Sequence, residues 1–214
     1  MKVFPEKSVT LLELIISMVI VGMIVFSFFS IHLFSRYHLI TSIRRAKLQN
    51  DVSYILEHMA KQISNSIGNE NIYGASSVAA NITTANAIRI NFYIDASRDG
   101  IRGNPQNNPP QNVDHWISYR YDTLGADQYS ITYCGRCQQS NCVNCMDSEE
   151  RLSAKITNFT PIINRNPDNT LRDNYVEVRV TSCWDPTNSN SCGYSENPVV
   201  SMNTRVKMPS VSAR

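Results

Sequence analysis

The chain begins with a long apolar segment that contains a single early carboxylate. From position 14 to position 31 there are 18 consecutive residues without a formal charge, and the apolar run continues to about Phe34. This is close to the minimum length of a helix that spans a bilayer. The pattern predicts a transmembrane helix over residues 9–34, with Glu13 near its start.

After His38 the helical pattern continues, but the apolar residues now lie on one face. They recur at spacings of three and four residues: Leu48, Val52, Ile55, Leu56, Met59, Ile63 and Ile67. The other face carries charged and amide side chains, no proline interrupts residues 9–66, and Gly68 is a helix stop signal. We therefore expect residues 35–67 to continue the helix and to pack their apolar stripe against the protein's own sheet.

From Gly68 onward the apolar period shortens to that of strands. Alternating or β-branched stretches predict strands at 87–94, 116–122, 128–133, 175–181 and 199–208. Residues 124–127 resemble a hairpin connection, and the polar stretches 98–115 and 184–198 are predicted loops. The expected fold class is α+β, with one long N-terminal helix packed on an antiparallel sheet of about four to six strands.

Composition narrows the class of function. Once the anchor is subtracted, 214 residues suit one globular domain, predicted over residues 68–214. The net charge of +2 comes from scattered basic residues, so no nucleic-acid footprint is predicted. All six cysteines lie between positions 134 and 192, which fits an oxidising, extracytoplasmic location for that domain.

A lone acid inside an apolar span costs a few kcal/mol, so Glu13 is expected to have a functional partner. The stretch Lys7-Ser-Val-Thr-Leu-Leu-Glu-Leu14 resembles the N-terminus of type IV pilins and of type II secretion pseudopilins. That family has a short basic leader, then Gly-Phe-Thr-Leu-Ile-Glu-Leu, then an apolar helix. In this chain Ser8 replaces the usual glycine and Val9 the usual phenylalanine or methionine.

The resemblance implies a maturation and assembly route. Residues 1–8 would be a leader that prepilin peptidase removes between Ser8 and Val9, and Val9 would be methylated. Glu13, the fifth mature residue, would meet the N-terminal amine of a neighbouring subunit. The chain would cross the bacterial inner membrane once, with its leader cytoplasmic and its globular domain periplasmic or extracellular.

The same resemblance implies the assembly and the partners. Processed chains would join other pilin or pseudopilin subunits in a type IV pilus or a type II secretion pseudopilus, and the element order is similar to minor pilins of the W class and J-class pseudopilins. The alternative is an uncleaved, membrane-anchored binding module. A cleaved secretory signal peptide fits poorly, because the apolar run is long and no small-residue site follows it.

The cysteines carry the densest pattern of the globular domain. Cys134-x-x-Cys137 and Cys142-x-x-Cys145 favour structural disulfides. A zinc site with four thiolates is a less favoured alternative, since only four residues separate the two pairs and would force a tight loop. A redox-active C-x-x-C is a third. Cys183 and Cys192 would most simply pair with each other.

Asp95, Ser97 and Asp99, followed by Gly100, match the first half of a calcium loop. A turn after a strand explains the same residues, so calcium and a simple turn both stay open. Three of the four histidines fall on the predicted helix, and the chain has no nucleophile elbow, zinc-protease or phosphate-loop motif. The sequence therefore predicts a protein that is not an enzyme and requires no cofactor.

Overall fold

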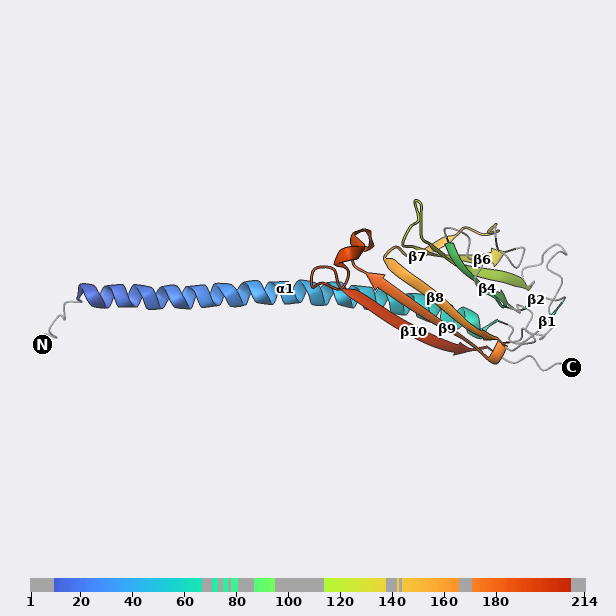
Figure 1. The fold of residues 1–214 in the computed structure, drawn as a ribbon, viewed down its shortest axis with the longest axis horizontal. Coiled ribbons are helices and arrows are strands. Elements are labelled where there is room, and N and C mark those ends of the chain that lie inside the picture. The colour runs from blue at the N-terminus through green and yellow to red at the C-terminus, as the bar shows by residue number, and fades with distance from the viewer. Residues whose placement is uncertain are drawn as a thin grey trace, which may run out of the picture. The chain divides into compact units, whose positions relative to one another are not determined.

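The computed structural model describes residues 10–66, 71–72, 75–76, 78–80, 87–94, 114–137, 142, 144–165 and 171–208. The chain divides into two compact units, Met1–Ile43 and Arg44–Arg214 (Figure 1). Helix α1 (Leu11–Ser64) begins in the first unit and ends in the second. Each unit is described by itself.

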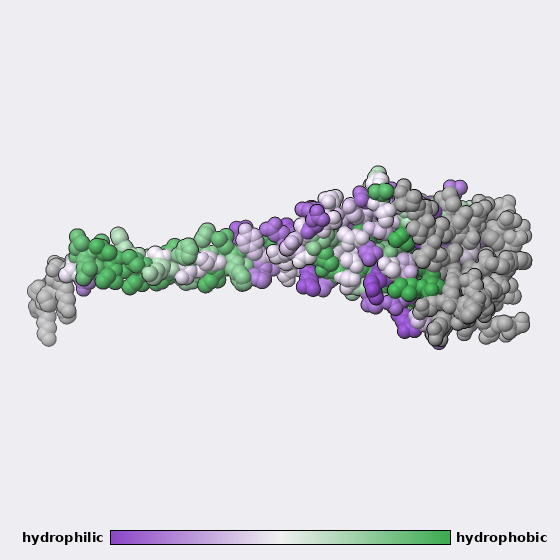
Figure 2. Space-filling view, viewed as in Figure 1, coloured by the Kyte–Doolittle hydropathy of each residue, from purple (hydrophilic) through white to green (hydrophobic). Residues whose placement is uncertain are grey.

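In the first unit, the apolar side chains of α1 have nothing to pack against. Every large apolar residue from Leu11 to Ile43 is exposed, with exposed fractions from 40% at Leu33 to 78% at Leu11. Figure 2 shows the N-terminal end of this helix as mostly hydrophobic, with pale and hydrophilic patches farther along. The helix is long and apolar enough to cross a membrane.

Three serine hydroxyls of this segment form hydrogen bonds inside the helix itself. Ser17, Ser27 and Ser30 each donate a hydrogen bond of 2.8–2.9 Å to a backbone carbonyl three or four residues earlier. A hydroxyl bonded in this way does not need water. The first part of α1 therefore suits an environment without water, such as hydrocarbon or the packed interior of an assembly.

In the second unit, α1 has one buried face. The six residues of the predicted stripe that the structure describes are all buried: Leu48, Val52, Ile55, Leu56, Met59 and Ile63. The predicted seventh, Ile67, lies outside the described residues. Tyr54 and Glu57, on other faces, are exposed, so the amphipathic prediction is confirmed.

All strand pairing is antiparallel within the described residues. Three sheets form, with strand orders β1-β2, β3-β4-β5-β6-β7 and β10-β9-β8. Their strands are β1 (Asn71–Ile72), β2 (Ala75–Ser76), β3 (Val78–Ala80), β4 (Ala87–Ile94), β5 (His115–Asp122), β6 (Ile131–Cys137), β7 (Glu150–Ser153), β8 (Ile156–Arg165), β9 (Leu171–Cys183) and β10 (Val199–Lys207). A short 3-10 helix, η1 (Pro186–Ser191), precedes β10.

The five-stranded and three-stranded sheets share one core with the second part of α1. Ile55 and Met59 of the helix belong to the same buried cluster as Phe92 of β4, Ile131 of β6 and Val178 of β9. The α+β class, with the helix packed on antiparallel strands, is confirmed. The expected single sheet is wrong, because the strands divide into separate sheets that the helix stripe joins.

The hairpin between β5 and β6 also differs from the prediction. The second strand begins at Ile131 and not at 128, because Tyr129 has a left-handed backbone with φ of 65°. Gly125, with φ of 97°, starts this turn, and its carbonyl accepts a 3.2 Å hydrogen bond from Gln128 N. The positive φ values reverse the chain over a longer connection than the sequence indicates.

Candidate functional site

The N-terminus of α1 is held by two side chains that bond reciprocally. The Glu13 Oε2 atom accepts hydrogen bonds from Thr10 N at 2.9 Å and from the Thr10 hydroxyl at 3.0 Å. In return, Glu13 N donates to Thr10 Oγ1 at 3.4 Å. This is a capping box, which satisfies backbone donors that the first helical turn leaves without partners. Glu13 therefore has a local structural role in a single chain.

Only one oxygen of the Glu13 carboxylate is used in this box. Both bonds from Thr10 reach Oε2, and Oε1 accepts no hydrogen bond from any residue that the structure describes. A carboxylate can accept several hydrogen bonds, so Oε1 is able to receive a cationic donor from another molecule. The positive end of the helix dipole favours the ionised carboxylate here as well.

Thr10 is the residue of this site that the interpretation of the sequence missed. Its signal was present, since a threonine three residues before a glutamate at the start of an apolar run is the pattern of a capping box. Ser8 and Val9, the predicted cleavage and methylation residues, lie outside the described residues.

Four cysteines form a second site at the end of β6. Disulfides join Cys134 to Cys145 and Cys137 to Cys142, with Cα separations of 5.8 and 5.2 Å. Cys134, Cys137 and Cys142 are buried against Tyr93 and Trp116, apart from the main core. The two disulfides fasten the segment after β6 back onto that strand.

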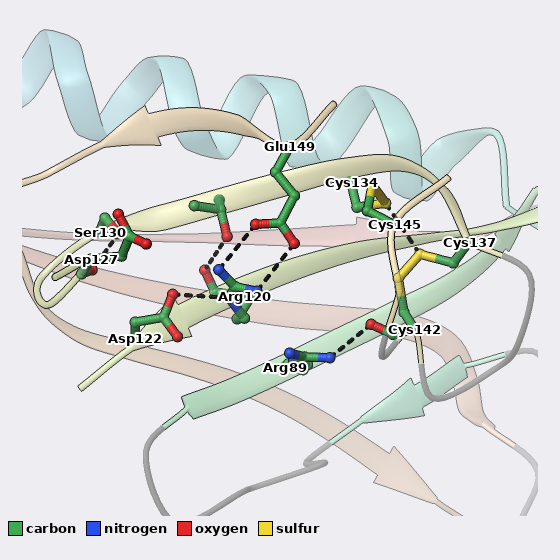
Figure 3. A network of polar contacts seen from close by, with 11 residues as sticks. Arg89, Arg120, Asp122, Asp127, Ser130, Cys134, Cys137, Cys142, Cys145 and Glu149 are labelled. Carbon is green, nitrogen blue, oxygen red and sulfur yellow. Dashed lines mark hydrogen bonds and ion pairs between the residues drawn. A yellow bond between two sulfur atoms is a disulfide. The ribbon is translucent and has the colours of Figure 1, made fainter. Parts of the chain in front are cut away.

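Polar contacts around the cysteines connect this segment to β4 and β5 (Figure 3). Arg89 of β4 donates a 2.7 Å hydrogen bond to the carbonyl of Cys142. On β5, Arg120 pairs with Asp122 at 2.9 Å and with Glu149 at 3.0 Å. Residues on both sides of Cys145 are thus tied to the five-stranded sheet.

The third disulfide, Cys183–Cys192, closes the loop that carries η1. Asn197 is buried inside this loop, where its amide donates to the Asp185 carbonyl and the Ser191 hydroxyl and accepts from Asp185 N. The sequence predicts the pairing of these two cysteines, and the structure contains it. The loop is ordered by one cross-link and one buried amide.

A polar cleft of about 530 Å³ opens beside this loop. Trp184 contributes to its lining, with the Arg44 guanidinium 5.5 Å and the Lys155 ammonium 3.6 Å from its ring centroid. Arg44 also donates to the carbonyl of Glu196. These cation–π contacts with the indole ring stabilise this part of the surface.

One histidine of α1 faces the five-stranded sheet. The His58 Nδ1 atom lies 2.9 Å from the Tyr119 hydroxyl, and the His58 ring lies 4.7 Å from that of Tyr133. Burial lowers the pKa of His58 and raises the pKa of both tyrosines. With neutral His58 carrying its proton on Nε2, Nδ1 accepts a hydrogen bond from the Tyr119 hydroxyl, and the ring packs against Tyr133.

The predicted calcium residues Asp95, Ser97 and Asp99 lie outside the described residues. Within the described ranges, one group of side chains has metal-ligating atoms close enough together to hold an ion. It consists of Cys134, Cys137 and Cys142. These sulfurs lie within 4.8 Å of one another.

No protein-family model, curated protein or solved structure matches this chain. The fold by itself defines an α+β protein with an exposed apolar N-terminal helix segment and disulfide cross-links.

Proposed function

We propose that this chain is a subunit of a pilin-type filament, a minor pilin or pseudopilin. In this proposal prepilin peptidase removes residues 1–8, Val9 is methylated, and the product assembles from the inner membrane into a type IV pilus or a type II secretion pseudopilus. The observation that carries the proposal is an uncovered apolar helix that begins at a capped carboxylate.

The uncovered surface requires a covering in every state of the protein. Before assembly, lipid tails cover the apolar residues from Leu11 to Phe34. After assembly, the same residues of neighbouring subunits do so. Lipid and protein side chains are about equally apolar, so the transfer is driven by close packing and by specific polar contacts, and not by hydrophobicity alone.

Glu13 supplies the specific polar contact. Its Oε2 caps its own helix, while Oε1, which accepts no hydrogen bond from the described residues, would receive the positively charged amine of a neighbouring mature N-terminus. An ion pair in an apolar interior offsets the cost of burying each charge alone, and it forms at one axial position only. Glu13 would therefore set the register between subunits.

The second unit supports the proposal because it has a hydrophobic core of its own. Its core is formed by α1 residues beyond Arg44 and by strands of two sheets, and its loops are cross-linked by three disulfides. A domain of this kind stays folded outside the membrane while the apolar segment changes its surroundings.

A membrane-anchored binding module is the second candidate, and the polar cleft beside Trp184 favours it. In that case the leader would remain attached and the apolar helix would only hold the domain at the membrane. The two candidates differ in the fate of residues 1–8.

N-terminal and intact-mass measurement of the protein from its own membranes, with and without active prepilin peptidase, tests the proposal. We expect a chain that begins at N-methylated Val9 when the peptidase is active and at Met1 when it is not. A chain that begins at Met1 in both strains would contradict pilin-type processing and support the anchored module.

Glu13 variants separate the charge from the cap. Glu13→Gln can still form the capping box but lacks the negative charge, whereas Glu13→Ala removes both. If Glu13 pairs with a neighbour's amine, both variants enter the membrane and are cleaved but fail to join filaments. Normal assembly of Glu13→Gln would show that the cap alone matters, and Thr10→Ser serves as the matched control that keeps cap and charge.

A further inference from the structure

The two disulfides at the end of β6 bring four sulfur atoms into one place. The Cys137 and Cys134 Sγ atoms, which belong to different disulfides, are 3.4 Å apart. The Sγ atoms of Cys134, Cys137 and Cys142 all lie within 4.8 Å of one another. The Cys145 Sγ atom is outside this group but is bonded to that of Cys134, so it would complete the set by a side-chain rotation once the disulfide is reduced. We infer that these four cysteines, when reduced, form a single tetrathiolate site for one Zn²⁺ ion.

The spacing of the sulfurs fits a tetrahedral site. Zinc–thiolate bonds of about 2.3 Å place neighbouring sulfurs about 3.8 Å apart. The contact between Cys137 and Cys134 already lies near that separation. Reduction removes the two covalent bonds, so the bonded sulfurs can separate to the same distance without moving the backbone far.

The backbone of this site accommodates the short spacing between the two C-x-x-C pairs. Cys137 and Cys145 form an isolated antiparallel bridge, and the carbonyl of Arg136 accepts a 2.9 Å hydrogen bond from Met146 N. The two pairs therefore face each other across a narrow ladder, as two ligand knuckles must.

The surroundings suit a buried anionic cluster. Cys134, Cys137 and Cys142 are at most 5% exposed, and Tyr93 and Trp116 exclude water from one side. Four thiolates and one Zn²⁺ carry a net charge of −2, and Arg89 brings a positive charge to the Cys142 carbonyl (Figure 3). The Nε atom of Arg89 is buried and has no hydrogen-bond partner among the described residues, so it remains able to donate to a thiolate.

The two states of the site are related by a balanced reaction. A dithiol reductant gives two electrons and two protons to each disulfide, which yields four thiols and two oxidised reductant molecules. The four thiols then release four protons as they bind Zn²⁺. Either state fastens the segment after β6 onto the sheet, so the cross-link survives a change from an oxidising to a reducing compartment.

Cys183 and Cys192 provide an internal control. They form a disulfide with each other in a different loop, and neither is bonded to any of the four cysteines at the end of β6. Reduced full-length protein in detergent, kept under a non-chelating phosphine reductant, should therefore bind one metal ion with four of its six thiols. With excess Zn²⁺, a thiol-reactive dye should label four thiols much more slowly than in the same reduced chain without metal. Zn²⁺ should leave the labelling rates of Cys183 and Cys192 unchanged.

Cobalt substitution identifies the ligand set. Co²⁺ should give the ligand-field and thiolate charge-transfer bands of a tetrahedral, all-sulfur site, and one equivalent of Zn²⁺ should remove them. Cys142→Ser should abolish the four-thiolate spectrum, whereas Cys192→Ser should leave it unchanged.

Rapid labelling of all six thiols in the presence of Zn²⁺, or the absence of tetrahedral Co²⁺ bands in the wild-type chain, would overturn the inference. Circular dichroism of the same reduced, metal-loaded samples should give the spectrum of the folded oxidised chain. An unfolded reduced chain that neither Zn²⁺ nor Co²⁺ refolds would overturn it equally, because a built site must stabilise the state that it binds.

Discussion

Helix α1 has two parts that arrange their apolar side chains in opposite ways. Up to Ile43 the large apolar side chains point in all directions and all are exposed, whereas from Leu48 to Ile63 they form one buried stripe. The second part buries its apolar side chains against other residues of the same chain. The apolar side chains of the first part can be covered only by lipid or by other molecules, so this part of the helix is suited to intermolecular contacts.

Truncating one isoleucine in each part of α1 should reveal the largest difference in stability between the two parts. Ile55→Ala should lower the free energy of unfolding of the globular unit by about 3 kcal/mol, because it leaves a cavity in the shared core. Ile24→Ala removes the same atoms from an exposed position and should leave that free energy unchanged. Denaturant titration in detergent, followed by tryptophan fluorescence, measures both. Equal losses would show that the two parts do not differ.

Features that depend on local interactions can be predicted from this sequence, whereas features that depend on tertiary contacts cannot. The apolar stripe and the strands predicted at 87–94, 116–122 and 175–181 depend on local periodicity, and the structure has a strand at each of these places. Strand β8 was not, because Pro161 disfavours a strand. It is tolerated since β8 lies at the edge of its sheet, and edge position is a property of the tertiary structure.

The sites divide in the same way. Glu13 was identified from its charge in an apolar run, but its cap depends on Thr10, which was overlooked. The pairing of Cys183 with Cys192 was predicted from proximity in sequence. The nested pairing of the other four cysteines, Cys134 with Cys145 and Cys137 with Cys142, does not follow from spacing, because it depends on how Cys142 and Cys145 are placed against β6.

Removal of a cross-link should have the next largest effect. The double variant Cys183→Ser, Cys192→Ser should lose about 2.5 kcal/mol of stability, because it restores entropy to the unfolded loop. The same denaturant titration measures it. The membrane insertion of α1 should not change, and a defect in insertion would contradict the independence of the two units.

His58 predicts how the globular unit responds to acid. Its pKa is lowered in the folded state by burial, near Tyr54, Tyr119 and Tyr133 and with Lys61 and Glu150 close by. The unfolded chain therefore binds the proton more tightly, and stability is complete above the ordinary value of 6.5 and falls as the pH drops below it.

His58→Gln should reduce this acid sensitivity, as measured by unfolding between pH 7 and pH 5 at roughly constant ionic strength. His38→Gln, in the first unit, is the matched control and should leave the profile of the globular unit unchanged. An identical pH profile for wild type and His58→Gln would exclude His58 as the responsible group.

The smallest effect is expected from the half-exposed ion pair beside the cysteines. Glu149→Gln should cost about 0.5 kcal/mol, because water screens the pair with Arg120 and Asp122 still neutralises that arginine. Glu57→Gln, at an exposed position on α1, should have no measurable effect. A loss of several kcal/mol for Glu149→Gln would show that the network contributes far more than its exposure indicates.

Photo-cross-linking from position 24 in native membranes tests most directly whether other subunits cover the first part of α1. With a benzophenone amino acid in place of Ile24, we predict cross-links to another copy or to another pilin-type subunit, which disappear without prepilin peptidase or in Glu13→Gln. The same probe at Glu57, in the second unit, should not give this helix-to-helix product. Lipid adducts alone at position 24, with active peptidase and intact Glu13, would contradict the account.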